Sequence, residues 1–203
     1  MNNPIKDSGS RTVFSTGANR DCKDENGRTD LMPNAVVARL INMADENTPF
    51  LEVRASITRD NFLSYLDDFV YNGNDEAMIQ AMHDFIIRND IFVKEYETLA
   101  KQLECEIDLE NVTARQLVSA AMIPLSMHFR NGTIKYGERN WEKGMPLHSY
   151  VDSGIRHYHK VNAALNDEPH HLAVLWNLMC GVWTKERLPK MNDLPFAKKL
   201  TAK

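Results

Sequence analysis

Carboxylates, imidazoles and cations gather between residues 135 and 171 in a pattern that could bind a polyphosphate and a divalent metal ion. Asp152 and Arg156 are four residues apart, a spacing that puts two side chains on one face of a helix. Asp167 and His171 follow at the expected start of the next helix, where unpaired backbone N–H groups favour anions. A short turn between two antiparallel helices would bring these groups together.

The loop that precedes these helices adds further polar side chains. They are Lys135, Glu138, Arg139, Asn140 and Lys143. Lysine and arginine bind phosphate oxygens, and carboxylates with imidazoles can hold a divalent metal. Mg²⁺ in proteins usually keeps water or substrate phosphates among its ligands. The combination therefore suits hydrolysis of a nucleoside triphosphate, in which metal and cations offset charge on the polyphosphate while an activated water attacks phosphorus.

The composition restricts the class of protein. With 203 residues, 43% of them hydrophobic, the chain suits one domain with a core. No apolar run approaches the roughly 18 residues of a membrane span. Three scattered cysteines and an N-terminus without signal-peptide character predict a cytoplasmic location. The net charge of −4 argues against a nucleic-acid partner, because phosphate-tracking surfaces are normally basic.

Helical periodicity dominates the chain beyond its first 33 residues, and no period-2 strand pattern is present. The first 33 residues are polar and predict an irregular segment. We predict a mainly α-helical fold, a bundle built around paired antiparallel helices at residues 149–165 and 167–185.

Capping residues mark where the helices should begin and end. Pro33 suits a first helical turn, and Thr58 and Asp167 suit N-caps. Pro124 should interrupt or kink the helix before the polar loop, and Gly132 should close it.

Two groups of motifs resemble a known family. Residues 132–179 contain GTIKYGERNWEKGMP, SYVDSGIRHYHK and DEPHHLAVLWNLM, and residues 17–33 read GANRDCKDENGRTDLMP. Together they resemble the phage dATP/dGTP diphosphohydrolase (MazZ-like) family, of the N-terminal-domain type. The resemblance implies an all-α nucleotide pyrophosphatase that needs Mg²⁺ or Mn²⁺ and hydrolyses a purine (deoxy)nucleoside triphosphate to monophosphate and pyrophosphate.

The motif positions imply a set of site residues. The catalytic residues would be Asp152, His157 and His171, and the metal ligands Asp152 and Asp167. The substrate-binding residues would be Arg20, Arg28, Lys135, Arg139, Asn140, Trp141 and Arg156, with Asp30 as a further member of the N-terminal motif. We also expect a homo-oligomer in the cytoplasm, the host cytoplasm if the chain is phage-encoded.

The spacing of the motifs suggests how the chain is divided. The family joins its two motif groups through one or two helices, whereas residues 34–134 lie between them here. We expect an irregular N-terminal segment that contributes to the site (1–33), a core helix (34–57), a helical insertion (58–110), the nucleotide-site core (111–186) and a flexible tail (187–203).

Simpler interpretations remain open for several of these residues. Asp152 with Arg156 has the spacing of a common surface ion pair, and Trp141 could pack beneath the loop instead of stacking on a base. The adjacent His83 and Asp84 resemble a phosphohydrolase metal motif but have no convincing partner histidine. At the level of function, the alternatives to hydrolysis are a protein that sequesters a nucleotide without cleaving it and a regulatory partner protein.

Overall fold

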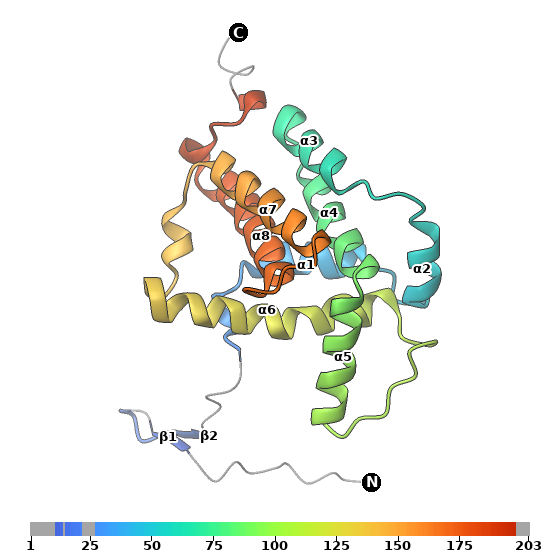
Figure 1. Cartoon of the computed structure of the whole chain (residues 1–203). Helices are drawn as coiled ribbons and strands as arrows, with labels where there is room; N and C mark the ends of the chain where they lie inside the picture. Colours follow the sequence, from blue (N-terminus) through green and yellow to red (C-terminus); the bar gives the residue numbers. More distant parts are fainter. Residues whose placement is uncertain (1–10, 14, 22–26, 198–203) are drawn as a thin grey trace.

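The computed structural model describes residues 11–13, 15–21 and 27–197 of the chain, and it confirms a mainly α-helical bundle (Figure 1). The helices are α1 (Asn34–Met43), α2 (Phe50–Ser56), α3 (Phe62–Asn72), α4 (Asp75–Arg88), α5 (Asp90–Gln102), α6 (Ala114–Tyr136), α7 (Leu147–Asn162) and α8 (His170–Arg187). Short 3-10 turns are η1 (Thr29–Leu31), η2 (Asn140–Lys143) and η3 (Pro189–Met191). Within the described residues, no helix combines the length and apolar character that crossing a membrane requires.

A small antiparallel hairpin, which the sequence did not predict, lies near the N-terminus. Strands β1 (Arg11–Val13) and β2 (Asn19–Asp21) pair with Thr12 opposite Arg20. The hairpin is drawn away from the helical body in Figure 1, so it adds nothing to the main core.

Helices α1, α4, α6 and α8 pack against one another around a common core. Helix α4 is buried on nearly all sides, because every residue from Ala77 to Ile87 except Gln80 is buried. Helix α4 lies in the segment 58–110, which the sequence predicts to be an insertion relative to the family. That relation to the family stays a prediction. The structure builds this segment into the core of the bundle.

Several expected helix ends lie elsewhere in the structure. Helix α3 is capped at Asn61 instead of Thr58, and Pro169 instead of Asp167 precedes α8. Helix α6 continues through Pro124 and Gly132 as a single helix that ends at Gly137, whose φ of 86° suits glycine. In each case the local sequence offered a suitable helix end, but the helix begins or ends at another residue.

The first part of the expected flexible tail is attached to the helical body. Leu194 is 3% exposed, and the ring of Phe196 packs against the Lys185 ammonium at 5.1 Å from the ring centroid. Residues 198–203 lie outside the described part of the chain.

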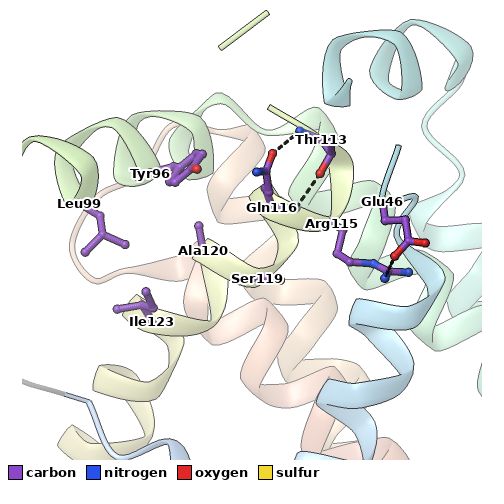
Figure 2. A pocket seen from close by; sticks show the side chains of 9 residues that line it. All are labelled: Glu46, Tyr96, Leu99, Thr113, Arg115, Gln116, Ser119, Ala120 and Ile123. Carbon is purple, nitrogen blue, oxygen red and sulfur yellow. Dashed lines mark hydrogen bonds and ion pairs between the residues drawn. The ribbon is translucent and has the colours of Figure 1, made fainter. Parts of the chain in front are cut away.

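The start of α6 is fixed by a reciprocal cap, which Figure 2 shows beside a shallow groove between α5 and α6. The Gln116 N–H donates to Thr113 Oγ1 at 3.2 Å, and the Thr113 N–H donates to Gln116 Oε1 at 2.8 Å. The Phe50 N–H also donates to the Val112 carbonyl at 2.8 Å, which joins the start of α2 to this turn. The capping box therefore stabilises α6 where the chain turns into it.

Replacing Thr113 with alanine should lower the free energy of unfolding by about 1 kcal/mol. The Gln116 N–H loses its acceptor, the Thr113 hydroxyl, and the reciprocal hydrogen bond to the Gln116 side chain is no longer part of a capping box. Urea denaturation would measure the loss. Thr98→Ala is the matched control, since the exposed Thr98 hydroxyl only donates back to the Lys94 carbonyl within α5. Equal losses in both variants would contradict a capping role.

Candidate functional site

Helices α7 and α8 form an antiparallel pair that carries most of the site. His157 of α7 lies beside His170 of α8, whereas Tyr150 lies beside Thr184, so residue numbers rise along one helix as they fall along the other. Gly154 allows the close approach, because a Cβ there would lie 2.7 Å from Leu178 Cδ1. The pair confirms the antiparallel helices that the sequence predicted.

A cavity of about 740 Å³ lies between α6, the polar loop with η2, and the α7–α8 pair. Apolar and aromatic side chains line part of it: Leu31, Phe129, Trp141, Met145 and Trp176. Charged and polar side chains line the rest, including His128, Lys135, Arg139, His148, Asp152, Arg156, His157, Glu168 and Asn177. The cavity thus combines an aromatic region with cations, imidazoles and carboxylates.

Seven of the site residues predicted from the sequence line this single cavity. They are Lys135, Arg139, Asn140, Trp141, Asp152, Arg156 and His157. Arg28, Asp167 and His171 do not line it, and the side chain of Arg20 lies outside the described part of the structure. The motifs therefore lie together in space, as their shared chemistry suggested.

The N-terminal segment forms one wall of the cavity through Leu31. The Trp141 indole N–H donates to the Leu31 carbonyl at 3.1 Å, and Arg139 Nη2 donates to the Asp30 carbonyl at 2.7 Å. Gly27 lies tightly against α6, where a Cβ would fall 1.7 Å from Ser126 Oγ. Residues 27–33 are consequently held against both the loop and α6.

Arg28 connects this segment to the loop and does not face the cavity. Its guanidinium donates twice to Asp30 at 2.8 Å and once to Glu138 at 3.0 Å. These hydrogen bonds raise the pKa of Arg28 above its ordinary value and lower the pKa of Asp30. The role predicted for Arg28 was substrate binding, whereas its contacts position the wall.

Trp141 is mainly a packing residue. It is 8% exposed, and its ring meets the edges of Phe129 and Trp183 at centroid distances of 5.9 and 4.8 Å. Trp176, which also lines the cavity, is only partly buried and lies 6.1 Å from Phe129. Trp176 is therefore better placed than Trp141 to offer the face of its ring to a ligand.

The cations of the cavity differ in how strongly protein groups engage them. Arg139 has φ of 52° and donates to Glu142 as well as to Asp30, so its guanidinium is largely paired within the protein. Arg156 is 54% exposed, donates to Ser153 Oγ at 2.9 Å and lies 3.9 Å from the Asp152 carboxylate. Arg156 is accordingly more available to an anion than Arg139, and the exposed Lys135 has its ammonium over the ring of Tyr136, 5.0 Å from the centroid.

Two histidines and a carboxylate meet where α7 ends and α8 begins. His157 Nδ1 lies 2.9 Å from His170 Nδ1. Glu168 Oε1 lies 3.3 Å from His170 Nδ1 and 3.6 Å from His157 Nδ1. Burial lowers the pKa of His157, a shift that the Glu168 carboxylate opposes and the neighbouring His170 reinforces. Burial likewise lowers the pKa of His128, which also lines the cavity.

Asp167 and His171 have other partners. Asp167 accepts from His170 Nε2 at 2.8 Å and from Lys160 at 3.2 Å, and these two hydrogen bonds lower its pKa to about 2. His171 Nε2 lies 2.8 Å from Glu95 Oε1 on α5, with its ring against Phe92. Asp167 therefore orients His170, and His171 joins α8 to α5.

The motif pattern did not select His128, Glu168 or His170 as site residues. Glu168 and His170 stand next to residues that it did select, so the clustering of acid and imidazole was the available signal. His128 lies inside α6 without any nearby motif, and nothing in its sequence context distinguishes it. The His83–Asp84 pair is buried in α4, hydrogen-bonded at 2.9 Å, and does not line this cavity.

One comparison with known protein families gives a match. Residues 104–194 match the family model described as dATP/dGTP diphosphohydrolase, N-terminal. No curated protein and no solved structure matches the chain. The matched residues include α6, α7 and α8, which enclose most of the cavity. For residues 104–194, the match confirms the family that the motifs predicted, the dATP/dGTP diphosphohydrolase family in its N-terminal part.

Proposed function

We propose that the cavity binds a purine deoxynucleoside triphosphate and that the chain hydrolyses it to the monophosphate and pyrophosphate. The observation that carries this proposal is the mixed lining of one cavity, in which aromatic rings lie beside cations, imidazoles and carboxylates. Its volume of about 740 Å³ falls in the usual range of ligand sites, roughly 300–1,000 Å³. The family description names dATP and dGTP, which supports a purine substrate.

The lining suggests how each part of the substrate is held. The aromatic face of Trp176 stacks on the purine, since every base has a π-face on which an aromatic ring can stack. Lys135 and Arg156 contact the phosphates, where charge-assisted hydrogen bonds are the strongest available. Arg139 adds positive potential while it stays hydrogen-bonded to the Asp30 carbonyl.

The reaction breaks the α–β phosphoanhydride. The oxygen of a water molecule forms a bond to the α-phosphorus, the bond from this phosphorus to the bridging oxygen breaks, and pyrophosphate leaves. We assign the proton released by the water to the Asp152 carboxylate, which lines the cavity beside Arg156. A divalent cation such as Mg²⁺ or Mn²⁺, when bound, offsets charge on the polyphosphate and lowers the pKa of bound water.

Incubating the purified chain with each of the four deoxynucleoside triphosphates and Mn²⁺, and separating the products by chromatography, tests the proposal. We expect dATP or dGTP to give its monophosphate and pyrophosphate in equal amounts. Release of orthophosphate would contradict cleavage at the α–β bond. Tight binding without any product would favour the sequestering alternative, and the absence of both binding and turnover would favour a partner protein.

A further inference from the structure

We infer that His157, Glu168 and His170 bind one divalent cation of a first-row transition metal. The inference deepens the proposed function by naming the ligands and the kind of cation, and it rests on that function for the role of the ion in hydrolysis. Binding of the ion itself is a separate property that can be measured without any nucleotide.

The distances between the three donor atoms suit ligands of one ion. With metal–ligand bonds of about 2.1 Å, two ligands at a right angle lie about 3.0 Å apart and two at the tetrahedral angle about 3.4 Å apart. The separations here are 2.9, 3.3 and 3.6 Å. All three atoms also lie within 4.8 Å of one another, so no backbone movement is needed to bring them together.

The surrounding contacts hold His170 in the form that a metal requires. His170 is 2% exposed, and its Nε2–H donates to the Asp167 carboxylate at 2.8 Å. In the neutral imidazole this hydrogen bond leaves a lone pair on Nδ1, directed at His157 and Glu168. A carboxylate that accepts from the second ring nitrogen is the usual partner of a metal-bound histidine. Lys160 holds Asp167 in turn, at 3.2 Å.

With both histidines neutral, a proton alone satisfies this arrangement poorly. If His157 Nδ1–H donates to His170 Nδ1, the Glu168 oxygen still faces the His170 lone pair at 3.3 Å. Two electron-rich atoms at that distance repel each other unless a positive charge lies between them. A divalent cation would interact favourably with all three donors.

The types of donor indicate which cations bind. Transition-metal cations such as Fe²⁺, Co²⁺ and Zn²⁺ bind imidazole nitrogen well, whereas Mg²⁺ favours oxygen ligands. The ligand pair predicted from the sequence, Asp152 and Asp167, offers only oxygen. In the structure, the Asp152 side chain is 78% exposed beside Arg156, and Asp167 is hydrogen-bonded to His170. His157 and Glu168 line the cavity, so the ion would lie at its edge, next to the space assigned to the polyphosphate.

Titration of the full, chelator-stripped chain with Co²⁺ tests the inference. We expect one equivalent to bind, with the visible absorption of nitrogen-coordinated Co²⁺, and to stay bound in excess Mg²⁺. Glu168→Gln, at a half-exposed position that leaves the core intact, should weaken the affinity at least about tenfold. His157→Ala should weaken it further. His159→Ala is the matched control, since this exposed histidine lies on the same helix and should change nothing.

Circular dichroism of each variant establishes that it is folded before its affinity is compared. The inference is overturned if the unmodified chain binds no Co²⁺, if Mg²⁺ displaces it readily, or if folded His157→Ala and Glu168→Gln bind it as well as His159→Ala does. Binding of Co²⁺ by a chain that hydrolyses no nucleotide would uphold this site and contradict the proposed function. Hydrolysis that persists in folded variants unable to bind Co²⁺ would uphold the proposed function and the ligands of this site, and would contradict a role of the ion in hydrolysis.

Discussion

The Arg156→Ala variant should hydrolyse its purine substrate with kcat/KM lowered roughly 10- to 100-fold. A hydrogen bond to a charged group contributes about 1.5–3 kcal/mol, and each 1.4 kcal/mol corresponds to a factor of ten in rate. Arg156 lines the cavity and is engaged only lightly, by Ser153 and by Asp152 at 3.9 Å. Its guanidinium is therefore free to pair with phosphate oxygens, and the fold should tolerate its removal.

Steady-state kinetics on dATP and dGTP would measure the effect, with two further variants for comparison. Arg156→Lys should lie between the original chain and Arg156→Ala, because an ammonium keeps the charge but loses the bidentate geometry. Arg187→Ala is the control, since Arg187 is exposed at the end of α8 and does not line the cavity. Unchanged kcat/KM in Arg156→Ala would show that the phosphates bind elsewhere.

Replacing Gly154 with valine should destabilise the protein by about 1–3 kcal/mol and separate the two helices that carry the site. Even a Cβ at this position would lie 2.7 Å from Leu178 Cδ1 and 3.7 Å from Asn177 Cβ. Leu178 is fully buried, so it has little room to move away. For a chain of this length we expect the Tm to fall by about 2–4 °C for each kcal/mol.

Gly132→Ala provides the contrasting variant for the same thermal melt. Gly132 lies inside α6, and a Cβ there would meet no atom within 4 Å. Alanine is favoured over glycine in a helix interior by about 1 kcal/mol, so this variant should melt at a higher temperature. If both variants melted at the temperature of the original chain, close packing at Gly154 would not matter to stability.

The positions of the helices followed from periodicity, and their ends did not. The spacing of Phe62, Leu63, Leu66 and Phe69 predicted α3, and all of them are buried except Leu63, which is 42% exposed. Its N-cap was assigned to Thr58 and lies at Asn61, because Phe62 must enter the core as the first residue of the helix. Local capping preference is worth about 1 kcal/mol, less than the burial of one large aromatic ring.

The motif residues on the loop and α7 line the cavity, whereas Asp167 and His171 near the start of α8 do not, and the role of each stays a prediction. His170 and His171 are adjacent, so their side chains point about 100° apart around the helix. His170 faces His157, and His171 faces Glu95 on α5. Which histidine turns towards the cavity depends on the rotation of α8 against α6 and α7, and the sequence pattern does not contain that angle.

Two expectations about the whole molecule remain predictions. The expected homo-oligomer depends on contacts between chains, and it stays a prediction. The insertion of residues 58–110 is a prediction about relatives. In the structure, α4 and α5 of this segment pack on the remainder of the bundle, and α3 stacks the ring of Phe62 on that of Tyr158 in α7. The burial of α4 does mean that removing this segment would expose the apolar sides of α6 and α8.

The hydrogen bond from the Trp141 indole to the Leu31 carbonyl joins residues 110 positions apart. The family match begins at residue 104, so a fragment cut to the matched boundaries would lack that carbonyl, the packing of α1 and the whole of α4. Such a fragment would not be an autonomous unit of folding. The smallest fragment that keeps this site therefore reaches back at least to Gly27, which lies against Ser126 of α6.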